Sequence, residues 1–134
     1  MIPNKIVARY QDGRIVKGST ADFMPNKAVF HIALTDSPPR AKLFDVIVKD
    51  LKAVFFVKDF VGNAQYNEKK DFDSVKTAAG RKIKVVFKDG EIMTGTTQGY
   101  QPGRPGFFVI PADPKSNIER FFVVSAAIRV ATYL

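Results

Sequence analysis

The sequence has no cysteine, no tryptophan and only one histidine among its 134 residues. Without cysteine the chain has neither a disulfide framework nor a thiolate ligand, which favours a cytoplasmic location. Its apolar runs, such as residues 53–57, are far shorter than the ~20 residues that a membrane-spanning helix needs. The first residues, MIPNKIVARY, contain no apolar stretch after a basic start, so no signal peptide is expected. We therefore expect a cytoplasmic protein without a membrane segment.

What the chain does have is an excess of positive charge, with a formal net charge of +8. The net charge is +4 in residues 1–57, zero in residues 58–80 and +4 in residues 81–134. This balance favours contact with phosphates or other anionic surfaces. Lysine and arginine form neither a tail nor a cluster, however, so most of them are expected on the solvated faces of strands.

The chain also repeats itself when the numbering is shifted by 77 positions. One register is held over residues 4–57 and 81–134, which we interpret as two copies of one unit. The matched positions include Asp12-Gly13 with Asp89-Gly90, Gly18 with Gly95, Phe30 with Phe107, Asp36 with Asp113, and Phe44 with Phe121. An internal duplication is therefore predicted.

Each copy is expected to form short strands. In KIVARY and RKIKVVF apolar and polar residues alternate, and an Asp-Gly pair typical of a tight primed hairpin turn follows each run. Gly18 and Gly95 interrupt the return strands, where an interior glycine indicates a bulge or a sharp bend. Five short strands per copy suit a small SH3-like barrel. The prediction is an all-β protein of two tandem small β-barrels, residues 1–57 and 81–134, joined by a partly helical or irregular linker at 58–80.

Two stretches resemble known families. The hairpin sequences YQDGRIVKG and FKDGEIMTG resemble the first hairpin of Sm-like proteins, which implies barrels of the Sm-like kind. The longer block GTTQGYQPGRPGFFVIPADPKSNIERFFVV resembles an uncharacterised bacterial domain family, some members of which carry the hairpin twice. The second resemblance covers more of the chain and implies no function.

The candidate binding residues lie at equivalent turns of the two copies. Phe23 and Lys27 in the first copy correspond to Tyr100 and Arg104 in the second. Small barrels bind single strands by stacking bases on aromatic rings while cations follow the phosphates, and packing at the barrel edge is the other interpretation of the two rings. The Sm-like resemblance implies a uridine site with Asp-x-x-x-Asn and Arg-Gly motifs, and the sequence departs from it: it has MPN and QPG, then KD and AA, at those places.

Residues that support catalysis are scarce. His31 corresponds to Phe108 in the other copy, so a packing role is favoured over acid–base chemistry. No zinc-ligand spacing, phosphate-binding loop or nucleophile elbow is present. Asp36 and Asp113 stand among prolines, alanine and lysine, which favours turns over a cation site. We expect a protein that is not an enzyme and that has no metal or cofactor.

The function expected from these observations is an uncharacterised non-catalytic binding or interaction module. The second copy is more apolar than the first, as GFFVIPADP against VFHIALTDSPP shows, and partly open barrels present strand edges that pair between subunits. Its partner is expected to be another protein or a second copy of the chain, as in a homodimer. The alternative is an RNA-binding or single-stranded DNA-binding protein of Sm-like type.

Overall fold

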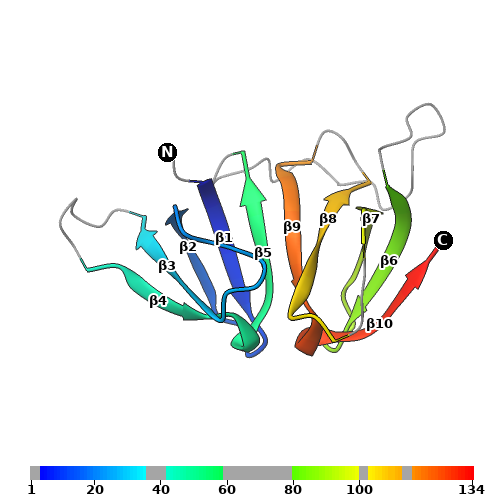
Figure 1. Ribbon diagram of the computed structural model, residues 1–134, viewed down its shortest axis with the longest axis horizontal. Helices are drawn as coiled ribbons and strands as arrows, with labels where there is room; N and C mark the ends of the chain where they lie inside the picture. Colours follow the sequence, from blue (N-terminus) through cyan, green and yellow to red (C-terminus); the bar gives the residue numbers. More distant parts are fainter. Residues whose placement is uncertain (1–3, 36–41, 59–79, 100–102, 113–115) are drawn as a thin grey trace.

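The computed structural model describes residues 4–35, 42–58, 80–99, 103–112 and 116–134 (Figure 1). In these ranges it contains ten β-strands and two 3₁₀ turns. The N-terminal half consists of β1 (Asn4–Tyr10), β2 (Ile15–Thr20), β3 (Val29–Leu34), β4 (Phe44–Ile47), η1 (Val48–Asp50) and β5 (Leu51–Val57). The C-terminal half consists of β6 (Arg81–Phe87), β7 (Ile92–Thr97), β8 (Gly106–Pro111), β9 (Ile118–Val124), η2 (Ser125–Ala127) and β10 (Ile128–Tyr133). The all-β prediction is confirmed, whereas the predicted linker helix falls in 59–79, outside the described residues.

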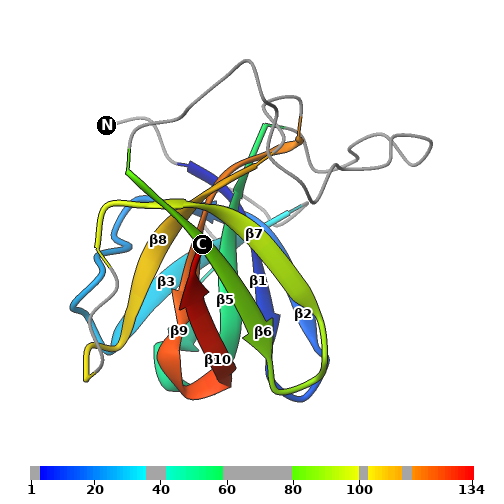
Figure 2. The ribbon, with the colours of Figure 1, turned by 90° about the vertical axis from the view of Figure 1, so that its right-hand side faces the viewer.

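The ten strands form one open antiparallel sheet and not two closed barrels, so the predicted architecture is corrected. The strand order is β10-β6-β7-β8-β9-β5-β1-β2-β3-β4, and each half curves around its own side of the molecule (Figure 1, Figure 2). The halves join where β5 pairs with β9, at the centre of Figure 1. Because β5 pairs with β1 on one side and β9 on the other, it cannot close a barrel with β4 of its own half.

Strand pairing follows the same registers in the two halves when the numbers are shifted by 77. Ile6 lies opposite Gly18, as Ile83 lies opposite Gly95. The β3–β4 and β8–β9 pairs agree in the same way. The two halves therefore share one local topology.

The predicted hairpins are present, but their turns differ from the primed type. The Tyr10 N–H donates to the Arg14 carbonyl and the Gly13 N–H to the Tyr10 carbonyl, so three residues form the loop. Gly13 has a φ of 96°, a left-handed conformation that suits glycine. Further along, a Cβ on Gly18 would lie 2.3 Å from the carbonyl oxygen of Ala33. The interior glycine thus permits close approach of β2 and β3, as a sharply bent sheet requires.

Two apolar cores lie on opposite faces of the central strands, because successive side chains of a strand point to opposite faces. On β5, Val54 and Phe56 belong to one core, whereas Ala53, Phe55 and Val57 belong to the other. The strand β9 divides its side chains in the same way. Every residue of β5 is therefore buried, and each core contains side chains from both halves.

Candidate binding groove between the two halves

A groove of about 610 Å³ lies between the halves. Residues 26–29 and 47–49 line it from the N-terminal half, and residues 103–105 and 124–126 line it from the C-terminal half. These segments correspond to one another when the numbering is shifted by 77. The groove is thus built from the β2–β3 and β4–β5 connections of one half and their counterparts in the other. We call it the inter-half groove.

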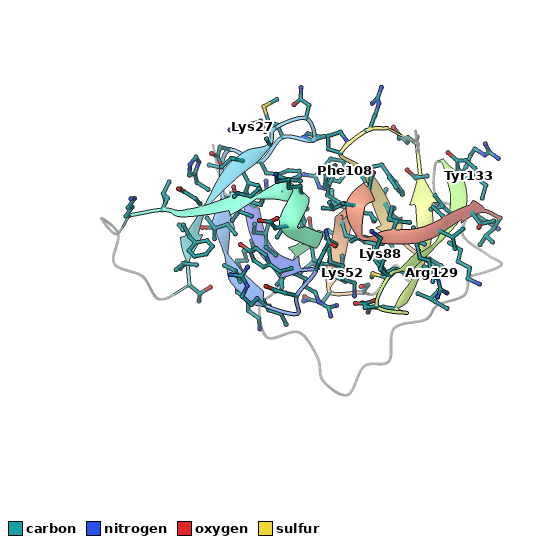
Figure 3. All side chains as sticks on the ribbon, turned by 90° about the horizontal axis from the view of Figure 1, so that it is seen from below. Lys27, Lys52, Lys88, Phe108, Arg129 and Tyr133 are labelled. Atoms are coloured by element: carbon teal, nitrogen blue, oxygen red, sulfur yellow. The ribbon has the colours of Figure 1, made fainter. Side chains whose placement is uncertain are left out.

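The structure brings two of the predicted binding residues together. Lys27 and Arg104 both line the inter-half groove, and Figure 3 shows Lys27 on the same side of the molecule as the loop that precedes β8. Their proximity could not be derived from the repeat, which only showed that they occupy equivalent turns. Lys49 lines the same groove and was not among the predicted binding residues.

Basic and apolar side chains dominate this groove. The charged residues among its described lining are Lys27, Lys49 and Arg104, all of them cations. Lys27 is held in place, since its Nζ donates to the Asp22 carbonyl at 3.2 Å and lies 3.6 Å from the Asp22 carboxylate. The backbone of Arg104 is fixed by Ser125, whose hydroxyl donates to the Arg104 carbonyl at 2.7 Å. The loops that carry Lys27 and Arg104 are therefore anchored, and the Lys27 ammonium points towards Asp22.

Of the predicted aromatic residues, Phe23 is half-buried and packs into the core. Its ring lies edge-on to Phe30 at 5.0 Å, Phe122 at 5.1 Å, Phe56 at 5.7 Å and Phe108 at 6.1 Å between centroids. Edge-to-face contacts of this kind stabilise a core. Tyr100 lies outside the described residues, as do Asp36 and Asp113.

A second hollow, of about 410 Å³, shares Arg104 with the inter-half groove. Phe108 and Arg120 are among its lining residues. The Arg120 guanidinium lies 4.4 Å from the Phe56 ring centroid and 4.8 Å from that of Phe108, distances typical of cation–π contacts. This hollow extends the positive surface beyond the groove.

His31 takes part in a charged network rather than in simple packing. Its Nδ1 lies 2.7 Å from an Asp22 carboxylate oxygen, and its Nε2 lies 3.4 Å from Asp45. Burial acts to raise the pKa of Asp22, but hydrogen bonds from His31 and Thr20, together with the Lys27 charge, lower that pKa to about 2. The network fixes the β2–β3 loop that carries Lys27.

A buried lysine links the halves, and the sequence analysis missed it. Lys52 on β5 is only 4% exposed, and its Nζ lies 2.7 Å from the Asp89 carboxylate and contacts Glu91. Arg9 contacts Glu91 at 3.2 Å. The hydrogen bond from Lys52 is the first cause that lowers the pKa of Asp89. The signal for this site was a lone charge in the apolar run LKAVFFV.

The described residues contain neither a metal-binding cluster nor a membrane-spanning helix. No group of histidine, cysteine, aspartate and glutamate side chains in that part of the chain is arranged to hold a metal ion. Within the same ranges, no helix has the length and apolar character needed to cross a bilayer.

Comparison with known proteins assigns the chain to a family. No curated protein and no solved structure matches it. One family model matches residues 2–134, in agreement with the predicted membership of an uncharacterised domain family. We conclude that the chain belongs to the family of unknown function DUF6982.

Proposed function

We propose that the protein is a non-catalytic binding module and that the inter-half groove holds an extended segment of another protein, one rich in acidic and apolar side chains. The composition of the groove carries this proposal. Its walls include Val29, Ile47 and Val124, and its charged lining residues are all basic. Charge complementarity selects an acidic partner, and the apolar walls bury its apolar side chains.

A protein segment fits this groove better than a nucleic acid does. Single-stranded nucleic acids gain roughly 1–3 kcal/mol per base from stacking on aromatic rings. The described residues that line the groove include no aromatic side chain, and the ring of Phe23 is engaged with four other rings. Aliphatic side chains of a peptide match aliphatic walls more closely than bases do.

The test is fluorescence anisotropy with a labelled peptide in which valine and aspartate alternate, compared with one in which valine and lysine alternate. We expect the acidic peptide alone to bind. Lys27→Ala/Arg104→Ala should weaken binding about 2- to 30-fold, because exposed ion pairs contribute about 0.2–1 kcal/mol each. Lys17→Ala/Lys84→Ala removes the same charge from exposed strand positions and should leave binding unchanged.

Equal losses in the two double variants would show that net charge, rather than the groove, drives binding. Absence of acidic-peptide binding at low salt would refute the proposal.

The second candidate function is the binding of RNA or single-stranded DNA. It is favoured by the convergence of Lys27 and Arg104 and by the neighbouring hollow with Phe108 and Arg120. Mixed-sequence oligonucleotides should then bind in the same assay, with an affinity that falls steeply as salt rises. Oligonucleotide binding that the Lys27→Ala/Arg104→Ala variant loses, without binding of the acidic peptide, would replace the first proposal by this one.

We also propose that the module arose by duplication and that it is cytoplasmic. We infer that the halves are duplicated copies of one SH3-like or Sm-like unit, which the shared registers at a shift of 77 support. The absence of cysteine supports a cytoplasmic location.

A further inference from the structure

The two ends of the sheet are β4 and β10. Each pairs with one neighbour within the described part of the chain, β4 with β3 and β10 with β6. They lie at opposite ends of the molecule (Figure 1), so they cannot pair with each other in one chain. An edge strand offers a row of backbone groups for pairing with another strand.

These two edges are counterparts of the two strands that join the halves. Shifted by 77, β9 corresponds to β4 and β5 corresponds to β10. The chain thus already contains one copy of the junction, in which Val54 lies opposite Phe122 and Phe55 opposite Phe121. At its two ends, β4 and β10 are the counterparts of these two strands but are not paired with each other.

Apolar side chains at these ends are exposed where their counterparts are buried. Val130 is 47% exposed and Leu134 is 64% exposed, whereas their counterparts on β5, Ala53 and Val57, are 0% and 8% exposed. On the other edge, Ile47 is 44% exposed, whereas Val124 is 1% exposed. The exposed residues at both edges thus match the positions that the junction buries.

The edges also lack the features that normally prevent pairing. Neither β4 nor β10 contains a proline, and each has one charged residue, Asp45 or Arg129. Natural edge strands that remain unpaired are usually interrupted by proline, a bulge or several charges. On β10 the bulge lies near its start, between Ile128 and Val130, and leaves the rest of the strand regular.

On both edge strands, backbone N–H groups point outward, as pairing with a further strand requires. The Leu134 N–H donates to the Lys82 carbonyl and the Val48 N–H to the Ala28 carbonyl. Successive N–H groups of a strand point to opposite sides of it within the sheet. The N–H of Ala131 therefore points away from β6, and that of Asp45 points away from β3. These two positions correspond to Val54 and Phe122, which face each other in the junction.

We propose that β10 of one chain pairs antiparallel with β4 of a second copy of this chain, in the register of the β5–β9 junction. Ala131 then lies opposite Asp45 of the second copy, and Val130 opposite Val46 of the second copy. The contact is head-to-tail, so each added chain leaves one β4 and one β10 open, and assembly ends only when a ring closes.

One ion pair of the junction has a counterpart in this contact. Lys52 binds Asp89 within the chain, and their counterparts are Arg129 and Asp12. Figure 3 shows Lys52 near the middle of the molecule and Arg129 on β10. Glu91, the other carboxylate on Lys52, corresponds to Arg14, which already binds Asp12 at 2.9 Å. The contact between chains therefore keeps one of the two acidic partners.

The test uses two variants that each block one edge. Ala131→Pro removes an outward N–H from β10, and Asp45→Pro removes one from β4, while the ladders inside the chain are kept. Mass is measured by light scattering and sedimentation, with circular dichroism to confirm folding. The wild type should form oligomers, and each variant alone should be monomeric. An equimolar mixture should give only a dimer, through the one intact β10 and the one intact β4.

A second pair of variants keeps the test valid if proline disturbs folding. Val130→Asp and Ile47→Asp place charges on the exposed apolar positions and should act in the same way, whereas Ile15→Asp, at a 55% exposed position of β2, should leave the mass unchanged. A monomeric wild type at micromolar concentration would overturn the proposal. So would a β4-blocked variant that still dimerises by itself, because the contact would then be two-fold rather than head-to-tail.

Discussion

The buried Lys52 gives the sharpest test of how the halves are held together, because the two sides of its ion pair differ in exposure. The Lys52 side chain is 5% exposed, whereas those of Asp89 and Glu91 are 52% and 35% exposed. If the lysine is removed, the carboxylates regain water. If the carboxylates are neutralised, the buried ammonium loses both acidic partners and keeps the ring of Phe87, 4.8 Å from its Nζ. The two deletions should therefore differ in cost.

We expect Asp89→Asn/Glu91→Gln to lower the free energy of unfolding by about 3–5 kcal/mol, the usual cost of leaving one buried charge unpaired. Lys52→Met, which keeps the volume of the side chain, should cost about 1 kcal/mol or less. The triple variant should recover most of the loss of the double variant. Urea unfolding followed by circular dichroism measures all three.

The exposed Arg14–Asp12 pair of the other hairpin is the matched control, since its side chains are 62% and 57% exposed. Arg14→Met should leave unfolding unchanged. A loss for Lys52→Met equal to or larger than that for the carboxylate variant would refute the assignment of Lys52 as the desolvated partner.

Two further predictions concern the bend of the sheet and the network around the β2–β3 loop. Gly18→Ala should lower the free energy of unfolding by about 1–3 kcal/mol, since its Cβ would lie 2.3 Å from a backbone oxygen. Gly99→Ala, whose Cβ would have nothing within 4 Å, is the control, and urea unfolding measures both. Asp22 has a folded pKa of about 2 against 3.8, so its contribution is present above about pH 4 and is lost as the pH falls towards 2. With 36% of its side chain exposed, that contribution is about 1 kcal/mol or less after screening. Asp22→Asn should remove this part of the acid dependence of the urea midpoint, and an unchanged profile would contradict the network.

Local structure was predictable from the sequence, whereas the junction of the halves was not. Alternation in residues 5–10 and the Asp-Gly pairs correctly predicted the hairpins because both signals depend on near neighbours. The pairing of β5 with β9 joins segments far apart in the chain, and no local pattern selects it over barrel closure. The unbroken burial of residues 51–57 is the trace of this pairing, because a strand with both faces buried has no polar alternation.

The candidate site shows the same division. Equivalent turns identified Lys27 and Arg104, but only the joined halves place them in one groove. Phe23 carried an ambiguous signal, since an aromatic residue beside a turn serves a core or a ligand equally well. His31 was expected to pack, and its contacts with Asp22 and Asp45 depend on the β2–β3 loop and on the pairing of β3 with β4, which its own strand does not specify.

The division of β5 between two cores affects the order in which the protein can be completed during synthesis. β5 is made before β9, so the face with Ala53, Phe55 and Val57 must wait for residues translated later. Until then the N-terminal half also lacks Phe122 and Val124 in its own core. The nascent N-terminal half therefore lacks part of its core and leaves apolar side chains of β5 exposed. Neither core has all of its side chains until β9, which is translated later, has paired with β5.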